Sequence, residues 1–97
     1  MIEGNVKNFD ELIKEGTVLV DFNANWCGPC KMLKPVLESV ASEGKKIVSI
    51  NVDDARDLAI KYGVMSIPCL VVFKDGKEVK RSIGLIGKSE IVDLMED

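Results

Sequence analysis

The chain has 97 residues, of which 46% are hydrophobic and 30% charged, and its formal net charge is -3. This length predicts a single domain over residues 1–97 with one core, and the hydrophobic fraction is too high for a disordered chain. Acidic and basic residues are interleaved without a concentrated basic face, so we expect no binding to nucleic acid. The longest apolar runs, such as residues 69–73, are far too short to span a bilayer, so we expect no membrane insertion.

The cysteine count and the first residues indicate a reducing compartment. Three cysteines cannot all pair within one chain, and a small secreted scaffold normally carries a larger, even set. The first residues contain neither the basic region nor the apolar stretch of a secretory signal. We therefore expect a cytoplasmic protein whose cysteines serve reactivity, metal binding or simple packing.

The first predicted elements are a short helix and a buried strand. Residues 9–14 form a helical stretch that Asn8 can cap, with two acidic residues in its first turn. Gly16 ends this stretch, because glycine readily takes the conformation that terminates helices. Residues 17–22 are a nearly continuous apolar run with β-branched residues, which is typical of a parallel strand covered on both faces.

This strand is predicted to begin a β-α-β unit. Pro29 suits the first turn of a helix, and Gly44 ends that helix. Residues 46–52 predict the second strand, so the unit should have a right-handed crossover. The apolar stripe of the helix repeats at spacings of three and four, through Met32, Leu33, Val36, Leu37 and Val40.

The second half of the chain predicts two helices around a hairpin. Asp53 or Asp54 can cap the first of these helices. The order of elements predicts an α/β fold, in which a central mixed sheet of five or four strands carries helices on both faces. The remaining elements are a helix ending at Tyr62, strands over residues 69–73 and 78–83 around an Asp-Gly turn, and a last helix over residues 88–95.

Cys27 and Cys30 stand where the first long strand leads into its helix. At positions i and i+3 of a helical turn, Cβ atoms lie about 5–6 Å apart. A disulfide accepts Cα separations of about 4.4–6.8 Å, so the pair can close or open with little backbone movement. The free N–H groups and the positive dipole end of the helix favour a thiolate there and lower the pKa of the cysteine.

The positions of the two cysteines predict their roles. Cys27, at the helix start and nearest to solvent, is expected to attack, and Cys30, one turn further in, is expected to resolve the mixed disulfide. Half a zinc site and a purely structural disulfide are the alternatives. A structural zinc site normally has four ligands, whereas the chain has no histidine and only one other cysteine, so we expect no metal.

Asp21 interrupts the apolar run of the first long strand. If that strand is covered on both faces, burial raises the pKa of the carboxyl, which can then exchange a proton with Cys30. The alternative is a carboxylate at a strand end that reaches solvent. A position inside the strand and six residues before Cys27 favours the buried base.

Trp26 and Cys69 each allow a structural and a functional interpretation. Trp26 is either a core residue or a rim residue that shields the thiols and contacts substrate, and its place on the loop before the helix favours the rim. Cys69 follows Pro68 directly. It is either a small buried residue at the head of a strand, the favoured interpretation, or an extra redox-active thiol near the cysteine pair.

Motifs along most of the chain resemble one family. The run Trp-Cys-Gly-Pro-Cys-Lys at residues 26–31 is highly specific, and other matching segments follow in the family's order. They are Val20-Asp21-Phe22 with Ala24, Pro35, Asn51-Val52-Asp53, Tyr62-Gly63-Val64, Ile67-Pro68, Phe73-Lys74-Asp75-Gly76 and Gly84. The chain thereby resembles the thioredoxin family over the whole domain. Gly28 and Pro29 are similar to the reducing members, whereas oxidases and isomerases often place a histidine between the cysteines.

The resemblance implies a function and a set of site residues. It implies a protein-disulfide reductase that carries electrons from NADPH, through a thioredoxin reductase, to clients such as ribonucleotide reductase, peroxiredoxins or methionine sulfoxide reductases. No bound cofactor is implied besides the redox-active Cys27–Cys30 disulfide, and we expect a monomer. The Ile67–Pro68 bond should be cis, with the Ile67 backbone pairing to an extended substrate. The loop and substrate groove would comprise Trp26, Gly28, Pro29, Ile67, Pro68 and Gly84.

Three positions depart from the family pattern. Asn23 stands where a second tryptophan is common, and Ser49 stands where many bacterial members place a buried lysine near the aspartate. Cys69 stands where threonine often follows the proline. Without a neighbouring lysine, Asp21 is expected to ionise less readily.

Overall fold

The computed structural model describes residues 1–96. Within these residues, five strands form one sheet in the order β1-β3-β2-β4-β5, and four helices pack on it. This confirms the predicted α/β fold with a mixed sheet, in its five-stranded form. The strands are β1 (Ile2–Glu3), β2 (Thr17–Asn23), β3 (Lys46–Asn51), β4 (Cys69–Lys74) and β5 (Lys77–Ile83), and the helices are α1 (Phe9–Ile13), α2 (Gly28–Ser42), α3 (Arg56–Lys61) and α4 (Lys88–Met95).

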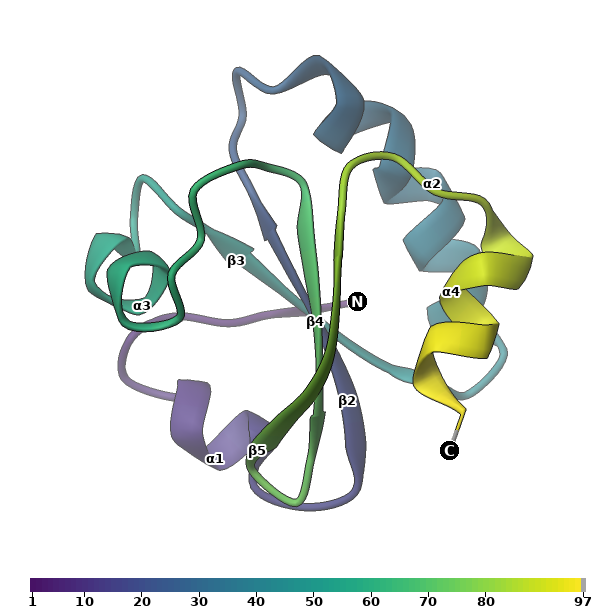
Figure 1. Ribbon diagram of the computed structural model, residues 1–97, viewed down its shortest axis with the longest axis horizontal. Coiled ribbons are helices and arrows are strands. Elements are labelled where there is room, and N and C mark those ends of the chain that lie inside the picture. The colour runs from purple at the N-terminus through teal and green to yellow at the C-terminus, as the bar shows by residue number, and fades with distance from the viewer. Residues whose placement is uncertain (97) are drawn as a thin grey trace.

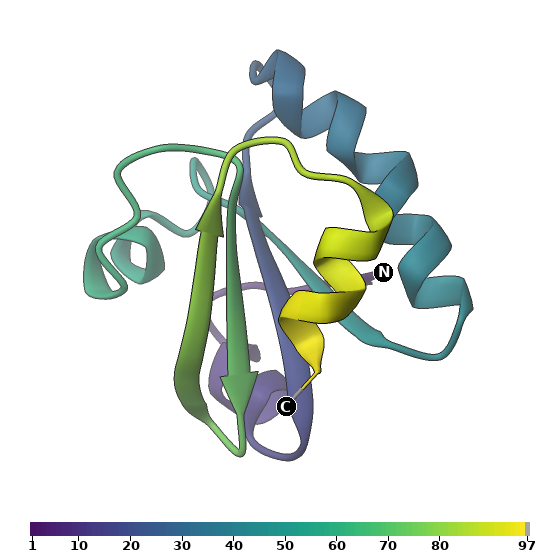
Figure 2. The ribbon, with the colours of Figure 1, turned by 45° about the vertical axis from the view of Figure 1, so that its right-hand side comes forward.

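The sheet is parallel on one side of β2 and antiparallel on the other. β3 pairs in parallel with both β1 and β2, whereas β4 pairs antiparallel with β2, and β5 pairs antiparallel with β4. Figure 2 shows β4 and β5 running side by side as a hairpin. Asp75 and Gly76 in its turn both have positive φ angles, of 51° and 86°. An Asp-Gly pair accepts such angles at low cost, which explains why this dipeptide joins the two strands.

Helices cover both faces of the sheet and enclose two apolar cores. Figure 1 shows α1 and α3 on one side of the strands and α2 and α4 on the other. Alternate residues of β2 point to opposite faces, so Val20 and Phe22 enter the core beneath α1 and α3, and Leu19 enters the core beneath α2 and α4. The strand is therefore buried on both faces, as its continuous apolar run predicts.

The pairing of β2 with β4 brings distant segments to one edge of the sheet. Because β4 runs antiparallel to β2, its first residue, Cys69, lies opposite Phe22 near the end of β2. The segment that leads into β4 contains Pro68, and the chain that leaves β2 enters α2 at Gly28. The start of α2 and the segment before β4 therefore meet at the same edge.

Two predicted helix caps are wrong. Asn8 occupies the N-cap position of α1, but its Oδ1 accepts a hydrogen bond from the N–H of Asn5, at 2.7 Å, and does not cap the helix. This local turn competes with capping, as asparagine side chains often do. Ala55, and neither Asp53 nor Asp54, is the N-cap residue of α3, and no side chain of the described residues caps that helix.

The apolar stripe of α2 is shifted from the predicted one. Met32, predicted to face inward, is 64% exposed. The buried positions of α2 are Cys30, Leu33, Leu37 and Val40, so the stripe begins at the second cysteine and passes beside Met32. α2 has 15 residues, and no helix within residues 1–96 is long and apolar enough to cross a membrane.

Candidate active site

The start of α2 brings Cys27 and Cys30 together. Cys27 is the N-cap residue, and Pro29 lies in the first turn. The two sulfur atoms form a disulfide, with Cα atoms 5.2 Å apart, inside the range expected for this spacing. The N–H of Cys30 donates to Cys27 Sγ at 3.2 Å. Since a charged acceptor strengthens such a hydrogen bond, the helix start favours a thiolate on Cys27 when the disulfide opens.

Both cysteines are nearly covered, but they have different neighbours. Cys27 is 5% exposed and Cys30 is 4% exposed, so the predicted difference in exposure is small in the closed disulfide. Cys27 Sγ lies 3.9 Å from the carbonyl oxygen of Ile67. Cys30 instead borders a polar cavity that is also lined by Asp21. The two sulfur atoms are thus distinguished by what they contact rather than by their exposure.

The segment before β4 packs against the cysteine pair. The Ile67–Pro68 peptide bond is cis, Pro68 is buried, and Ile67 packs on the small cluster that contains both cysteines. The N–H of Gly84 donates to the carbonyl oxygen of Pro68 at 2.8 Å. Gly84 has a φ angle of 98°, which strains any residue with a side chain. Glycine therefore allows the end of β5 to hold the proline segment in place.

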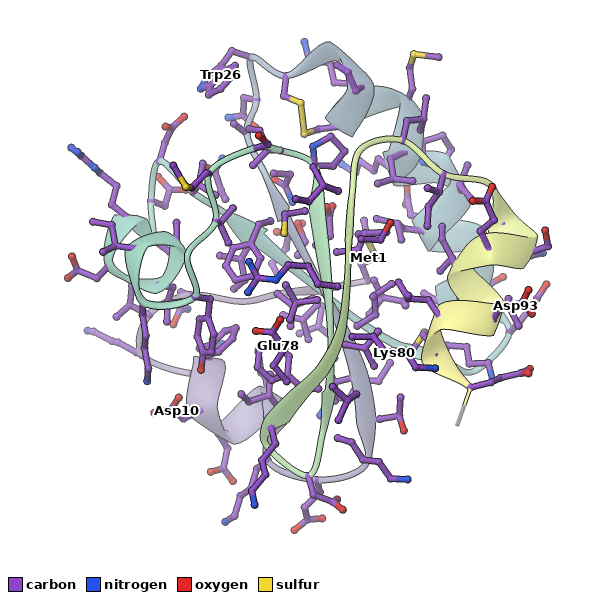
Figure 3. All side chains as sticks on the ribbon, in the orientation of Figure 1. Met1, Asp10, Trp26, Glu78, Lys80 and Asp93 are labelled. Carbon is purple, nitrogen blue, oxygen red and sulfur yellow. A yellow bond between two sulfur atoms is a disulfide. The ribbon has the colours of Figure 1, made fainter. Side chains whose placement is uncertain are left out.

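Trp26, Gly28 and Pro29 form an exposed rim beside the disulfide. Trp26 is 70% exposed, so it is not a core residue, and Figure 3 shows it projecting from the loop next to the yellow disulfide bond. Its Nε1–H donates to Asp53 Oδ2 at 2.9 Å. This is the contact that occupies Asp53 in place of the predicted helix cap. It joins residues 27 positions apart, so no local pattern in the sequence indicates it.

A shallow apolar groove begins at Trp26. Its volume is about 260 Å³, and it runs between the rim, α3 and the segment before β4. Side chains of Ile60 and Met65, 73% and 95% exposed, stand at its border. Exposed apolar side chains of this size gathered in one place are typical of a surface that binds a partner. Besides Met65, the apolar residues that line it are Trp26, Val52, Ala59, Ile60, Val64 and Ile67, and the charged Asp53 and Arg56 line it as well.

Asp21 is buried within the sheet, with 2% of its surface exposed. The pKa of its carboxyl is raised from 3.8 to about 6, because the effect of burial outweighs a hydrogen bond from Asn23, which lowers the pKa, and the negative charge of Glu3 raises it further. Oδ2 accepts from Asn23 Nδ2 at 3.1 Å, whereas Oδ1 has no hydrogen-bond partner within residues 1–96. A carboxyl with this pKa can gain and lose a proton close to neutral pH.

Two of the positions that depart from the family pattern meet at Asp21. The register of β2 on β3 pairs Asp21 with Ser49, and Asn23 Nδ2 donates to Ser49 Oγ at 2.8 Å. All three side chains line the cavity of about 570 Å³ that Cys30 also borders. The environment of the carboxyl is therefore a polar cavity with an amide donor. The sequence marks these positions as unusual, but the contact between them depends on the register.

Cys69 lies in the core on the other face of the sheet. It is fully buried, in the cluster beneath α1 and α3, and it has no disulfide partner. Burial raises the pKa of its thiol, against the opposing effect of the positive charge of Arg81. This environment suits the small packing residue that is the favoured interpretation of Cys69. Within residues 1–96, no group of three or more His, Cys, Asp or Glu side chains could hold a metal ion.

Comparisons with known proteins agree on one family. The family model described as Thioredoxin matches residues 1–97. A thioredoxin of Chlamydia caviae is 50% identical over 93 residues, which cover 94% of this chain and 91% of that protein. A thioredoxin of Staphylococcus haemolyticus is 48% identical over 92 residues, covering 92% of this chain and 88% of that protein. The sequence likeness therefore extends over nearly the whole length of these relatives.

A solved structure shows the same arrangement. A mutant thioredoxin from Halobacterium salinarum superposes with a TM-score of 0.93 at 38% sequence identity, covering 98% of this chain and 87% of that one. The strand-to-helix turn that carries the cysteine pair thus belongs to a fold shared with a known thioredoxin. The sequence comparisons and the structural comparison identify the same family. The chain therefore belongs to the thioredoxin family of disulfide oxidoreductases, with Cys27 and Cys30 as its active-site pair.

Proposed function

We propose that this protein reduces disulfides in other proteins, with Cys27 as the attacking thiolate and Cys30 as the resolving thiol. The observation that carries this assignment is the hydrogen bond from the Cys30 N–H to Cys27 Sγ. It supports negative charge on Cys27 and leaves Cys30 to act second. Gly28 and Pro29 carry no charge that would stabilise the reduced pair, which favours donation of electrons to a client.

The proposed reaction has two exchange steps. In the first, the Cys27 thiolate attacks a client disulfide, bonds to one client sulfur and releases the other as a thiolate. In the second, Cys30 loses its proton and attacks Cys27 Sγ, which breaks the bond to the client and forms the Cys27–Cys30 disulfide. The client gains two electrons and takes up protons as a dithiol, and the protein loses two electrons.

Asp21 is proposed to take the proton from Cys30 and to return it in the reverse reaction. Its support is a pKa of about 6, raised by burial, together with an oxygen, Oδ1, that no group within residues 1–96 occupies. Asp21 and Cys30 line the same cavity, so a proton can pass between them directly or through water.

The groove is proposed to hold the client while Cys27 attacks. The carbonyl oxygen of Ile67 lies 3.9 Å from Cys27 Sγ, so a client strand pairing with this backbone would place its disulfide at the attacking sulfur. Trp26, Gly28, Pro29 and the segment around Pro68 and Gly84 would border the bound strand. Trp26 would supply apolar contact area, since it is exposed and fixed by Asp53.

Family membership supports the wider setting of the reaction. A thioredoxin reductase is proposed to restore the Cys27–Cys30 dithiol with electrons from NADPH, so the chain carries electrons to clients without a bound cofactor of its own. The thioredoxins of Chlamydia caviae and Staphylococcus haemolyticus match this chain over nearly their whole length, which supports a single domain over residues 1–97. We propose that the protein works as a monomer in the cytoplasm.

Insulin reduction tests this function. With dithiothreitol, or with thioredoxin reductase and NADPH, the protein should precipitate the insulin B chain, and Cys27→Ser should abolish the reaction. Cys30→Ser should accumulate mixed disulfides with clients, because the resolving thiol is gone. Cys69→Ala, a change in the core on the opposite face, is the control that keeps activity. Mixed disulfides trapped through Cys30 in the Cys27→Ser variant would reverse the assigned roles.

A further inference from the structure

One face of the sheet changes character along β2 and β3. Near the starts of these strands, Leu19 and Ile47 belong to the apolar core beneath α2 and α4. Two residues later on each strand, the register pairs Asp21 with Ser49, and Asn23 follows on the same face. The apolar core therefore gives way to a polar patch at the point where α2 begins.

The carboxamide of Asn23 is the centre of this patch. Its Nδ2 donates to Asp21 Oδ2 at 3.1 Å, to the backbone oxygen of Asp21 at 3.0 Å and to Ser49 Oγ at 2.8 Å. The amide NH2 has two hydrogens, so two of these three acceptors share one of them, and the contacts to Asp21 and to Ser49 together fix the orientation of the amide. Because Asn23 occupies Oδ2, it leaves Oδ1, which has no partner within residues 1–96, as the oxygen that can accept a proton.

Charged side chains lie around the cavity, but none of them within residues 1–96 donates a hydrogen bond to the carboxyl of Asp21. Of the residues that the structure describes, Asn23 is the side chain that forms a hydrogen bond to this group. On β4, the residue opposite Asp21 is the apolar Leu70, and Cys69 is buried on the other face. The residues with charged side chains that line the cavity are Glu3 on β1, Lys31 and Lys34 on α2, and Asp54 after β3, and Met1, the first residue of the chain, lines it as well.

We propose that Asn23 is a positioning residue for the resolving step: its amide holds one oxygen of Asp21, keeps the carboxylate ionised, and directs the other oxygen to the proton of Cys30. This inference rests on the proposed reductase function and deepens it. In that step the proton of Cys30 Sγ moves to Asp21 Oδ1. The electron pair left on Sγ forms the bond to Cys27 Sγ, and the pair of the broken bond leaves with the client sulfur.

The amide therefore stabilises the ionised carboxylate of Asp21, as a buried lysine can do in family members that have one at the position of Ser49. A hydrogen bond to an ionised carboxylate stabilises the charged form and lowers the pKa, which offsets part of the effect of burial. Asn23 does so without a second titrating group. The part of the Asp21 pKa shift that Asn23 contributes therefore comes from an amide whose charge does not change with pH.

Asn23→Leu tests the proposal, because leucine has a similar volume and no donor. The pKa of Asp21, followed by carboxyl carbon NMR in the reduced protein, should rise by about one unit. The pH at which resolution of a preformed mixed disulfide becomes fast should rise by the same amount, so that resolution near pH 5 is about tenfold slower. Ser49→Ala is the matched control: it removes a neighbour of the amide but keeps the bond to Asp21, and the pKa should not rise.

Each alternative outcome decides against the proposal. An unchanged Asp21 pKa in Asn23→Leu would show that the amide does not hold the carboxylate ionised. An equal rise in Ser49→Ala would assign the effect to the polarity of the cavity and not to Asn23. If Asn23→Leu does not fold, Asn23→Ala is titrated in its place and judged by the same comparison.

The kinetic arm separates this proposal from the reductase function. In an Asp21→Asn background, Asn23→Leu should leave the resolution rate unchanged, because the group that it positions is gone. A further loss of rate in that background would overturn the positioning role. A wild-type protein that cannot reduce insulin would instead refute the proposed function, and the NMR titration would still report whether Asn23 tunes Asp21.

Discussion

Two hollows flank the disulfide, and they differ in chemistry. The apolar groove of about 260 Å³ begins at Trp26 and reaches Ile67, whose carbonyl oxygen contacts Cys27. The polar cavity of about 570 Å³ contains Asp21 and borders Cys30. The groove that suits an apolar client thus adjoins the sulfur of Cys27, and the cavity that holds the proton acceptor adjoins the sulfur of Cys30. The two halves of disulfide exchange are separated in space although their sulfur atoms are bonded.

Asp21→Asn is expected to have the largest effect on this comparison. Burial raises the pKa of Asp21 from 3.8 to about 6 in the folded protein, so the folded state binds this proton more tightly than the unfolded state. Stability therefore falls as the pH rises from about 4 to 6, and the cost reaches about 3 kcal/mol above that range. Asparagine does not ionise, so the oxidised variant should be more stable at pH 7 by about that amount. The mixed disulfide of the variant with a client should resolve more slowly, because Cys30 has lost its proton acceptor.

Denaturant unfolding at several pH values measures this effect. The stability of Asp21→Asn and of the wild type should coincide near pH 3, where both states of the wild type are protonated, and diverge between pH 4 and 6. Asp54→Asn, which removes an exposed carboxylate at the same cavity, is the control: its stability relative to the wild type should not change between pH 4 and 6. A stability difference of the same size at pH 3 and pH 7 would mean that ionisation of Asp21 does not cause it.

The two sides of the site differ in how far the sequence predicts them. The cysteine pair and the buried position of Asp21 follow from local patterns: a continuous apolar run, a proline in the first helical turn, and a spacing of three residues. These signals lie within one β-α-β unit, where secondary structure fixes the direction of each side chain. The cis bond at Pro68 and the place of Gly84 at the groove are implied by the family resemblance, and no local pattern predicts them.

The contacts between distant segments could not be predicted in this way. Asn23 reaches Ser49 only because β2 and β3 pair in one particular register, and Trp26 reaches Asp53 across 27 residues. The local sequence predicts Asp53 or Asp54 as a helix cap, since aspartate before a helix is a good cap when nothing else competes for it. The indole N–H of Trp26 is the competitor, and it comes from another element.

Trp26→Ala should weaken the binding of a client in the apolar groove. The free-energy change should be smaller than the change in stability expected for Asp21→Asn. Because Trp26 is 70% exposed, folding stability should change by less than about 0.5 kcal/mol. Loss of an apolar contact of this size to a bound client should raise KM for a protein disulfide about tenfold, with kcat little changed. Steady-state reduction of a disulfide-containing protein, with thioredoxin reductase in excess, separates the two constants.

The control for Trp26 is another exposed apolar side chain away from both hollows beside the disulfide. Val79 on β5 is 51% exposed, and Val79→Ala should leave KM and kcat near the wild-type values. A fall in kcat with KM unchanged in Trp26→Ala would place the tryptophan in the chemical step, against a role confined to binding.

Asp53→Ala should have the smallest effect, and it tests whether the rim is held in place. The variant removes the acceptor of the Trp26 Nε1–H, so the indole gains freedom that a client must remove on binding. A hydrogen bond at an exposed site contributes about 0.5–1 kcal/mol, which predicts a rise in KM of about threefold. Asp53→Asn keeps an oxygen acceptor and loses the charge, so it should bind clients as the wild type does. Equal weakening in Asp53→Asn would assign the effect to the charge of the carboxylate, and additive effects of Asp53→Ala and Trp26→Ala in the double variant would show that Asp53 does not act through the tryptophan.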